Sequence, residues 1–144
     1  MAKEISAGAV IFHRNADLRY LLLKYRYKSE YWDFPKGNVE KGEREEETVR
    51  REVKEETGME DIKFVPGFKE KIFYFYRRGE ETIFKQVTFY LVEALKTAVK
   101  ISAEHVGFEW VSFETARSRL KQKSKEVLEK AHVFLTKGMK NFFE

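Results

Sequence analysis

Short apolar runs bounded by turn residues fill the first part of the chain. Residues 5–14 and 19–26 are rich in Ile, Val, Leu, Tyr and Phe, and the Asn-Ala-Asp-Leu stretch between them has the composition of a turn. This pattern predicts a β-hairpin. Residues 31–35 continue as a short extended segment that stops at Pro35. The residue before a proline is restricted to extended conformations, which agrees with this prediction.

A helical pattern follows over about residues 43–57. Helix-forming residues fill this stretch, and Val49 and Val53 stand four positions apart, so they share one face of a helix. Gly58 lies where a helix C-cap is expected. We therefore predict a helix with a narrow apolar side that ends at Gly58.

Strand patterns return in the middle of the chain. Residues 61–68, 70–78 and 82–95 read as extended segments, and the turn around Gly79 is predicted to join the last two as a hairpin. Residues 107–113 have the pattern of one more strand.

Two helical patterns close the sequence. Ser112 is predicted to cap a helix over residues 114–120, and residues 125–143 carry a second, longer pattern. The order of these elements indicates an α/β protein with a mixed β-sheet and a helix on each side. With no repeat, linker or low-complexity tract, residues 1–144 are expected to form a single domain.

Composition restricts the class of protein. Hydrophobic residues make up 42% of the chain and argue against disorder, whereas charged residues reach 36%, above the usual share of about 25%. The net charge of +4 favours anionic ligands in general and not nucleic acid in particular. Without cysteine, a membrane-length apolar run or the pattern of a signal peptide, the expected location is cytoplasmic, with no membrane partner.

The carboxylates of the predicted helix are the first candidate chemistry. Glu52 and Glu56 share one helix face beside Val49 and Val53, and Glu55 lies one step further round. Clustered like charges at the edge of an apolar side repel each other unless a cation lies among them. Oxygen-rich sites suit hard divalent ions, while zinc is disfavoured because the chain has no cysteine and its three histidines are far apart. The plain alternative is a solvated, salt-bridged helix.

The loop before this helix offers a second candidate. Lys36, Gly37 and Gly42 combine a cation with residues that let backbone approach a ligand closely. Together with the carboxylate face, the loop suggests a metal-assisted phosphate site. Taken alone, it is an ordinary turn leading into a helix.

The spacing of these residues resembles the Nudix box, the sequence motif of the Nudix hydrolase family. Every defined position of that motif has a match here, and the order of elements is similar to the Nudix fold, an α/β/α sandwich with a mixed β-sheet between helices. The matching residues are Gly37, Glu43, Arg51, Glu52, Val53, Glu55, Glu56, Gly58 and Met59.

The resemblance implies a hydrolase of nucleoside diphosphate derivatives that uses Mg²⁺, with Mn²⁺ as the alternative ion. By the match to the family, Glu52, Glu55 and Glu56 would hold the metal, with help from the carbonyl of Gly37. Water would attack a phosphorus atom. Glu43 and Arg51 are interpreted as an internal ion pair that shapes the loop onto the helix.

Stretches outside the box resemble the dinucleoside tetraphosphate hydrolases that cleave asymmetrically, over about residues 5–135. That resemblance implies cleavage of diadenosine tetraphosphate to ATP and AMP. It also implies that Glu104 completes the metal site or acts as the base, against the plain alternative of a capping or surface acid. Relatives often have histidine where this chain has Asn38, a departure at one phosphate contact.

Four residues are candidates for substrate binding. Lys36 and Lys85 would hold the polyphosphate, although Lys85 also fits a solvent-facing strand position. Tyr74 and Tyr76 share one strand face and would stack on adenine, although ordinary core aromatics show the same pattern.

Two other functions remain open. One is removal of pyrophosphate from RNA 5′ ends, in which the basic run over residues 117–125 would contact RNA, or would otherwise be the solvated side of helices. The other is a nucleotide-binding domain without catalysis. Members of that kind often lack box glutamates, and this chain keeps them.

Overall fold

The computed structural model describes residues 2–27 and 29–143, with side chains described up to residue 137. Its centre is one mixed β-sheet, in which the two long strands β1 and β6 pair in parallel and the other pairings are antiparallel. The strand order is β3-β2-β1-β6-β5, with β4 paired to β1 and β7 paired to β2. The strands are β1 (Ala2–Arg14), β2 (Leu18–Tyr27), β3 (Ser29–Asp33), β4 (Lys36–Asn38), β5 (Ile62–Arg78), β6 (Glu81–Ala94) and β7 (His105–Val111).

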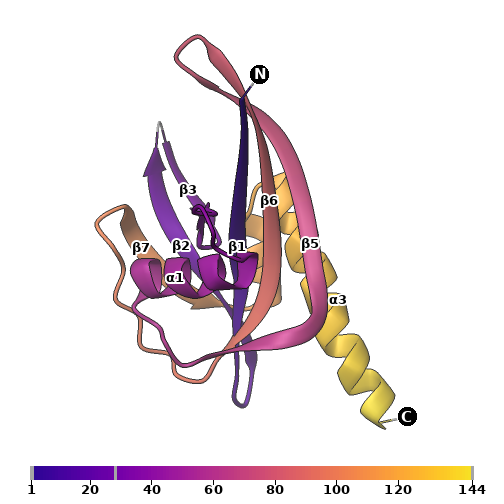
Figure 1. The fold of residues 1–144 in the computed structure, drawn as a ribbon. Coiled ribbons are helices and arrows are strands. Elements are labelled where there is room, and N and C mark those ends of the chain that lie inside the picture. The colour runs from indigo at the N-terminus through magenta and orange to yellow at the C-terminus, as the bar shows by residue number, and fades with distance from the viewer. Residues whose placement is uncertain (1, 28, 144) are drawn as a thin grey trace.

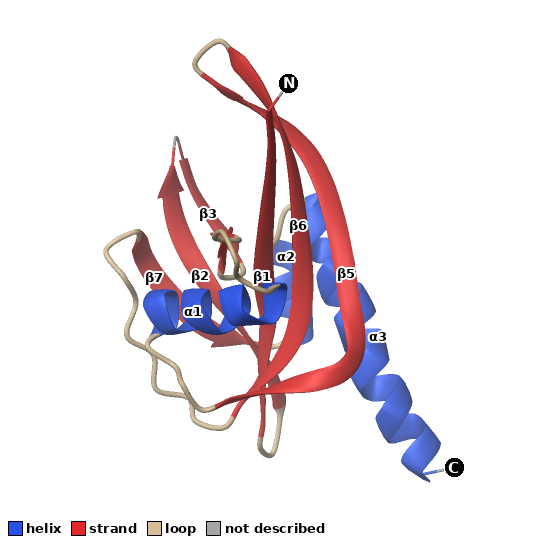
Figure 2. Ribbon diagram, viewed as in Figure 1, coloured by secondary structure: helices blue, strands red, loops and turns tan. Residues whose placement is uncertain are grey.

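Helices cover both faces of this sheet, as Figures 1 and 2 show. Helix α1 (Glu45–Thr57) crosses one face, and α2 (Phe113–Arg119) and α3 (Gln122–Phe143) lie on the other. Gly58 ends α1 in the left-handed conformation, and the Ser112 hydroxyl accepts a hydrogen bond from the Thr115 amide at the start of α2. These caps confirm the predicted end of α1 at Gly58 and the predicted cap of α2 at Ser112. Among the described residues, no helix combines the length and apolarity needed to cross a membrane.

The sheet opens between β1 and β2, and this opening positions the site. The two strands pair only from Phe12–Tyr20 to Arg14–Leu18. Further along the same side of β1, the short strand β4 takes over, with Ala7 opposite Gly37. Because successive residues of a strand point to opposite faces, Gly37 faces α1 while its neighbours face the side of α3.

Two apolar cores, one on each face, hold the helices to the sheet. Alternation along β1 divides its residues between them, with Ala7, Ala9 and Ile11 in the core under α1 and Val10 and Phe12 in the core under α2 and α3. Val49 and Val53 are buried in the α1 core, as their spacing predicted. The larger core contains Phe89 and Leu91 of β6 with Val127, Leu128, Ala131 and Leu135 of α3.

Several element ends differ by a few residues from the sequence-based prediction, residues 36–38 form a strand where a loop was expected, and one predicted strand boundary is wrong. Residues 61–68 and 70–78 were expected as separate segments, but they form the single strand β5. Its register with β6 shifts between the Phe64–Val92 and Lys69–Tyr90 pairs, and Gly67 lies there at φ 90°. Pro66 and Gly67 bend the strand without ending it, because a proline or glycine is tolerated where the ladder is interrupted.

Candidate active site

A close approach of backbone to side chain joins β4 to helix α1. A Cβ atom built on Gly37 would lie 2.1 Å from the Oε1 atom of Glu52, a separation that real side chains do not reach. A side chain at residue 37 would therefore displace the Glu52 carboxylate from its position against β4. This contact places the Gly37 backbone beside the Glu52 carboxylate, the pair that the sequence indicated for metal binding.

Arg51 connects the loop to the glutamates of α1. Its guanidinium donates to Glu43 at 2.8 and 3.0 Å, to Glu52 at 2.7 Å and to the Asn38 carbonyl at 3.0 Å. Hydrogen bonds from Arg51, and then from Thr48, lower the pKa of Glu43 to about 2. The predicted ion pair between Glu43 and Arg51 is confirmed.

The ionised form of Glu52 is disfavoured in the protein without metal. Burial raises its pKa to about 7, and the nearby charges of Glu56 and Glu55 add to that effect, while Arg51 opposes it. A single guanidinium therefore does not neutralise this group of carboxylates. A divalent cation among them would favour the ionised form of Glu52.

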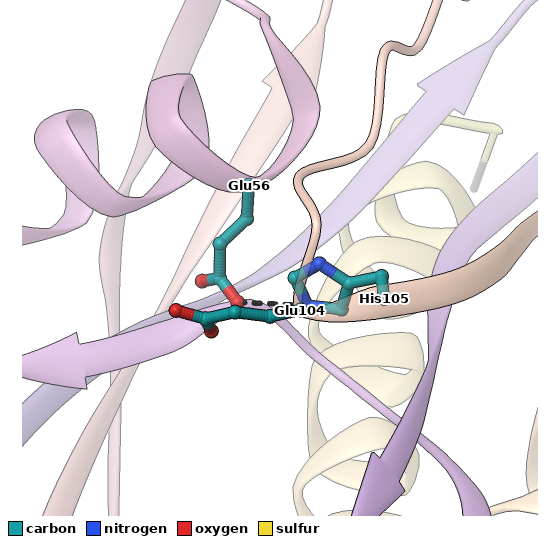
Figure 3. Close-up of side chains that lie close together, drawn as sticks. All are labelled: Glu56, Glu104 and His105. Atoms are coloured by element: carbon teal, nitrogen blue, oxygen red, sulfur yellow. Dashed lines mark ion pairs between the residues drawn. The ribbon is translucent and has the colours of Figure 1, made fainter.

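Glu56 is the buried carboxylate of the site. Its Oε2 atom accepts from the Lys36 amide at 3.0 Å, and the Tyr25 hydroxyl lies 3.1 Å from Oε1. Oε1 is also 3.0 Å from Nε2 of His105. Figure 3 shows Glu56 pointing from α1 towards Glu104 and His105, and the ligand atoms of these three residues lie within 4.8 Å of one another.

His105 was not identified as a site residue from the sequence. It begins β7 directly after the exposed Glu104, and its side chain is buried against the Tyr25 ring at 4.4 Å. Nδ1 lies 2.9 Å from the Ser102 hydroxyl, whereas buried Nε2 makes no aligned hydrogen bond to any described residue. The signal available in the sequence was its place next to a candidate acid where a loop meets a strand.

The predicted metal-binding residues therefore fall into two neighbouring groups. Glu56 and Glu104 meet at His105, while Arg51 contacts Glu52 and, at 3.4 Å, the more exposed Glu55. Several carboxylates and a backbone carbonyl form an oxygen donor set that fits a hard divalent cation, while the imidazole of His105 lies beside them.

Lys85 and Tyr76 meet at an acid that the sequence did not reveal. Glu4 accepts from Tyr76 at 2.6 Å and from Lys85 at 3.2 Å, and it also contacts Arg78. The hydrogen bond from Tyr76, together with Arg78 and Lys85, lowers the pKa of Glu4 to about 2 although burial opposes this. The Lys85 side chain is only 13% exposed, so the interpretation as a solvent-facing lysine is wrong.

Asn38 links this group to β4. Its side-chain oxygen accepts from Lys85 at 3.0 Å and from the Ser6 hydroxyl at 2.7 Å. Asn38 therefore binds Lys85 through its side chain and Arg51 through its carbonyl, and it joins the lysine to the charged helix.

Lys36 and Tyr74 lie on the same side of β4 as Lys85. The Lys36 ammonium donates to Asp33 at 2.9 Å, and although burial opposes the charged form, Asp33 raises the pKa of Lys36 above its usual value. Tyr74 pairs with Lys85 across the β5–β6 ladder, and its ring lies 6.4 Å from that of Tyr76. The predicted common face of the two tyrosines is confirmed.

The basic run over residues 117–125 is largely engaged within the protein. Arg117 pairs with Glu129 at 3.1 Å, and Arg119 pairs with Glu109 at 2.8 Å. These contacts fit the interpretation of the run as a charged side of helices better than that of an RNA contact.

Fold and site together define the class. The structure has a mixed sheet between helices, with the glutamates of the Nudix box beside Gly37 of β4, as the motif predicts. The family model described as NUDIX domain matches residues 3–131. The chain belongs to the Nudix family of hydrolases.

Several named proteins are similar to this chain in sequence or structure. The chain is 32% identical over 142 residues to a Mus musculus protein named bis(5′-nucleosyl)-tetraphosphatase (asymmetrical), covering 90% of this chain and 94% of the relative. The Ap4A hydrolase of C. elegans in a binary complex has a TM-score of 0.81 at 29% identity, covering 92% and 98% of the two chains. An RNA pyrophosphohydrolase of Nitratiruptor sp. matches over 43 residues, or 30% of this chain and 28% of the relative, at 42% identity.

The raised pKa of Glu52 predicts a pH-dependent stability in the absence of metal. A carboxyl group that holds its proton up to about pH 7 when folded, against 4.5 ordinarily, stabilises the fold at low pH and loses that contribution as pH rises through this window. In Glu52→Gln the loss is absent. Urea unfolding in a chelator should show the stability of this variant rising relative to wild type between pH 4.5 and 7.

Glu47→Gln on the same helix is the matched control. Hydrogen bonds from the Arg44 backbone and side chain lower the pKa of Glu47, so its contribution is present above the ordinary value and is lost as pH falls. This variant should therefore lose stability relative to wild type as pH rises towards 4.5 from below. If the difference in unfolding free energy between Glu52→Gln and wild type does not change with pH, the raised pKa of Glu52 would be contradicted.

Proposed function

We propose that this protein hydrolyses dinucleoside polyphosphates and cleaves diadenosine tetraphosphate to ATP and AMP. The observation that supports this most is the meeting of Glu56, Glu104 and His105 beside β4, with Lys36 and Lys85 on the other side of the same strand. Carboxylates for a metal and cations for phosphates are thereby held together within one short segment. The similarity to asymmetrical bis(5′-nucleosyl)-tetraphosphatases supports the substrate class.

Mg²⁺ is the proposed metal, with Mn²⁺ as the alternative, and Gly37, Glu52, Glu55, Glu56 and Glu104 are the proposed ligands. When bound, such an ion neutralises phosphate oxygens and acidifies water. The chain supplies the rest of the electrostatics. Arg51 orients the Glu52 carboxylate, while the Lys36 amide and the Tyr25 hydroxyl orient the Glu56 carboxylate. Both carboxylates are thereby held in place and remain available to a cation.

Glu104 is proposed as the general base. It is exposed on the loop before β7, so water can reach it, and it lies beside buried Glu56. As the water oxygen bonds to phosphorus, Glu104 accepts the proton, and the bridging P–O bond breaks to release the leaving nucleotide. His105 faces the same carboxylates and limits the positions that they can adopt.

The substrate is proposed to span β4. Lys36 and Lys85 would hold the polyphosphate by charge, while Tyr74 and Tyr76 would contact adenine through their rings. Because β4 is only three residues long, both sides of it can touch one extended ligand. We place the reaction in the cytoplasm on the composition of the sequence.

The products test this function directly. Diadenosine tetraphosphate should give equal amounts of ATP and AMP, because phosphates counted from an anchored adenine set the bond that breaks. Hydrolysis in ¹⁸O-water, followed by mass spectrometry, should place the label on AMP alone. Two molecules of ADP would contradict the proposal. So would rapid pyrophosphate release from triphosphorylated RNA without turnover of the dinucleotide, which would favour the RNA 5′-pyrophosphohydrolase reading.

Substitutions of the two meeting carboxylates should separate their roles. Glu56→Gln should lower kcat by several orders of magnitude. If the variant keeps more than about a tenth of wild-type kcat, which is a loss of under about 1.4 kcal/mol of transition-state stabilisation, Glu56 does not belong to the site. Glu104→Gln should lower kcat by about 10²- to 10⁴-fold and leave nucleotide affinity nearly unchanged, as for a group that acts mainly in the transition state. Steady-state kinetics and nucleotide titration measure both, and a pure rise in KM would make Glu104 a binding residue.

Lys85→Met tests the phosphate contact. The lost charge should raise KM for diadenosine tetraphosphate by about tenfold or more, since a charge-assisted hydrogen bond contributes about 1.5–3 kcal/mol. Glu4 keeps Tyr76 and Arg78 as partners, so the variant should remain folded. Lys96→Met is the matched control, because that lysine is 78% exposed and pairs with Asp61. An unchanged KM and product ratio in Lys85→Met would remove Lys85 from the site.

A further inference from the structure

The end of the β5–β6 hairpin carries aromatic rings on the sheet face that does not contribute to the substrate site. Strand alternation places Phe73 and Phe75 on the face opposite to Tyr74 and Tyr76, beside Phe84 of β6. We call this region the aromatic–basic face and define it by Lys3, Ile5, Lys71, Phe73, Phe75, Arg77 and Phe84.

Its three phenylalanine rings contact one another, and two of them are exposed, while Phe84 is half-buried between them. The rings of Phe73 and Phe84 are parallel, with 7° between their planes and centroids 5.8 Å apart, and Phe75 lies 5.1 Å from Phe84. Phe73 is 43% exposed and Phe75 is 61% exposed. A contiguous group of exposed aromatics of this kind marks a binding surface, since it contributes little to either core.

The charges around these rings have one sign. Lys3, Lys71 and Arg77 border the phenylalanines, and none of them has a carboxylate partner within the described part of the chain; Arg77 donates to Thr82 at 3.2 Å. The nearby acids point elsewhere, because Glu4 is engaged with Tyr76 and Lys85 on the opposite face. The charges that an anionic ligand would meet on this face are therefore those of Lys3, Lys71 and Arg77.

This combination selects among possible occupants. A second copy of the chain, placed face to face, would bring three cations against three cations, which disfavours a symmetric dimer. An acidic peptide would satisfy the cations but leave the ring planes without flat partners. Unpaired bases offer flat π-faces, and their phosphates carry the opposite charge.

We propose that the aromatic–basic face binds single-stranded RNA, with bases stacked on Phe75 and Phe84 and phosphates near Lys3, Lys71 and Arg77. A single strand is favoured over a duplex because it presents unstacked bases to aromatic side chains, whereas in duplexes the bases are hidden. The surface lies on the same side of the sheet as α1, outside the group of proposed substrate residues. It does not depend on the proposed hydrolytic function.

The test is fluorescence anisotropy with a labelled oligouridine that carries a 5′-hydroxyl. This probe has no phosphoric anhydride, so it is no substrate for the proposed active site. Wild type should bind it more tightly than a duplex RNA of equal length or an oligodeoxythymidine. Phe75→Ala should weaken binding by at least fivefold, while diadenosine tetraphosphate turnover stays unchanged. Lys71→Gln should reduce the salt slope of log K by about 0.7, the contribution of one phosphate contact on a single strand.

Phe108→Ala provides the matched control, because that phenylalanine is 41% exposed but lies on β7. It should leave oligouridine binding as in wild type. Equal binding of single-stranded and duplex RNA, a preference for the DNA oligomer, or an unchanged affinity in Phe75→Ala would overturn the proposal. It would also be overturned by a dimer in sedimentation that Phe75→Ala dissociates, since the face would then be occupied by a second copy.

Discussion

The close approach of the Gly37 backbone to the Glu52 carboxylate is the contact on which the site depends. A side chain at position 37 would overlap the Glu52 carboxylate, so this carboxylate can lie against β4 only where residue 37 is a glycine. That meeting is possible because β1 pairs with β2 for a few residues and then accepts β4 along the same side. The opening of the sheet is therefore the structural reason that box glutamates and loop backbone share one site.

Electrostatics then decides what this site can hold. Arg51 is shared among Glu43, Glu52 and Glu55, so its one positive charge is divided over several carboxylates. The raised pKa of Glu52 shows the imbalance that results, with burial as its main cause and like charges as the next. A fold that keeps such a group next to buried Glu56 gives up stability in the absence of a cation, and regains it when one binds.

Local periodicity was sufficient to predict the helix, its buried valines and the common face of Tyr74 and Tyr76, because these depend on neighbours a few positions apart. Contacts between distant segments were beyond it. Glu4 meets Tyr76 across 72 positions, because β1 pairs in parallel with β6 and β6 pairs with β5. The position of His105 likewise depends on how β7 pairs with β2 beside α1, which no local pattern encodes. Likewise, the bend at Gly67 was taken for a strand boundary because proline and glycine punctuate both turns and bulges.

The β5–β6 hairpin shows how a single period of two can separate two groups of side chains. Tyr74, Tyr76 and Lys85 point to one face and join Glu4, while Phe73, Phe75 and Phe84 point to the other. Each residue on one face is flanked by residues of the other, so an insertion of one residue would exchange both sets. A substitution that keeps the register changes only one face. The two surfaces can therefore vary independently in side chain but not in strand register, and the long β1–β6 and β5–β6 ladders fix that register.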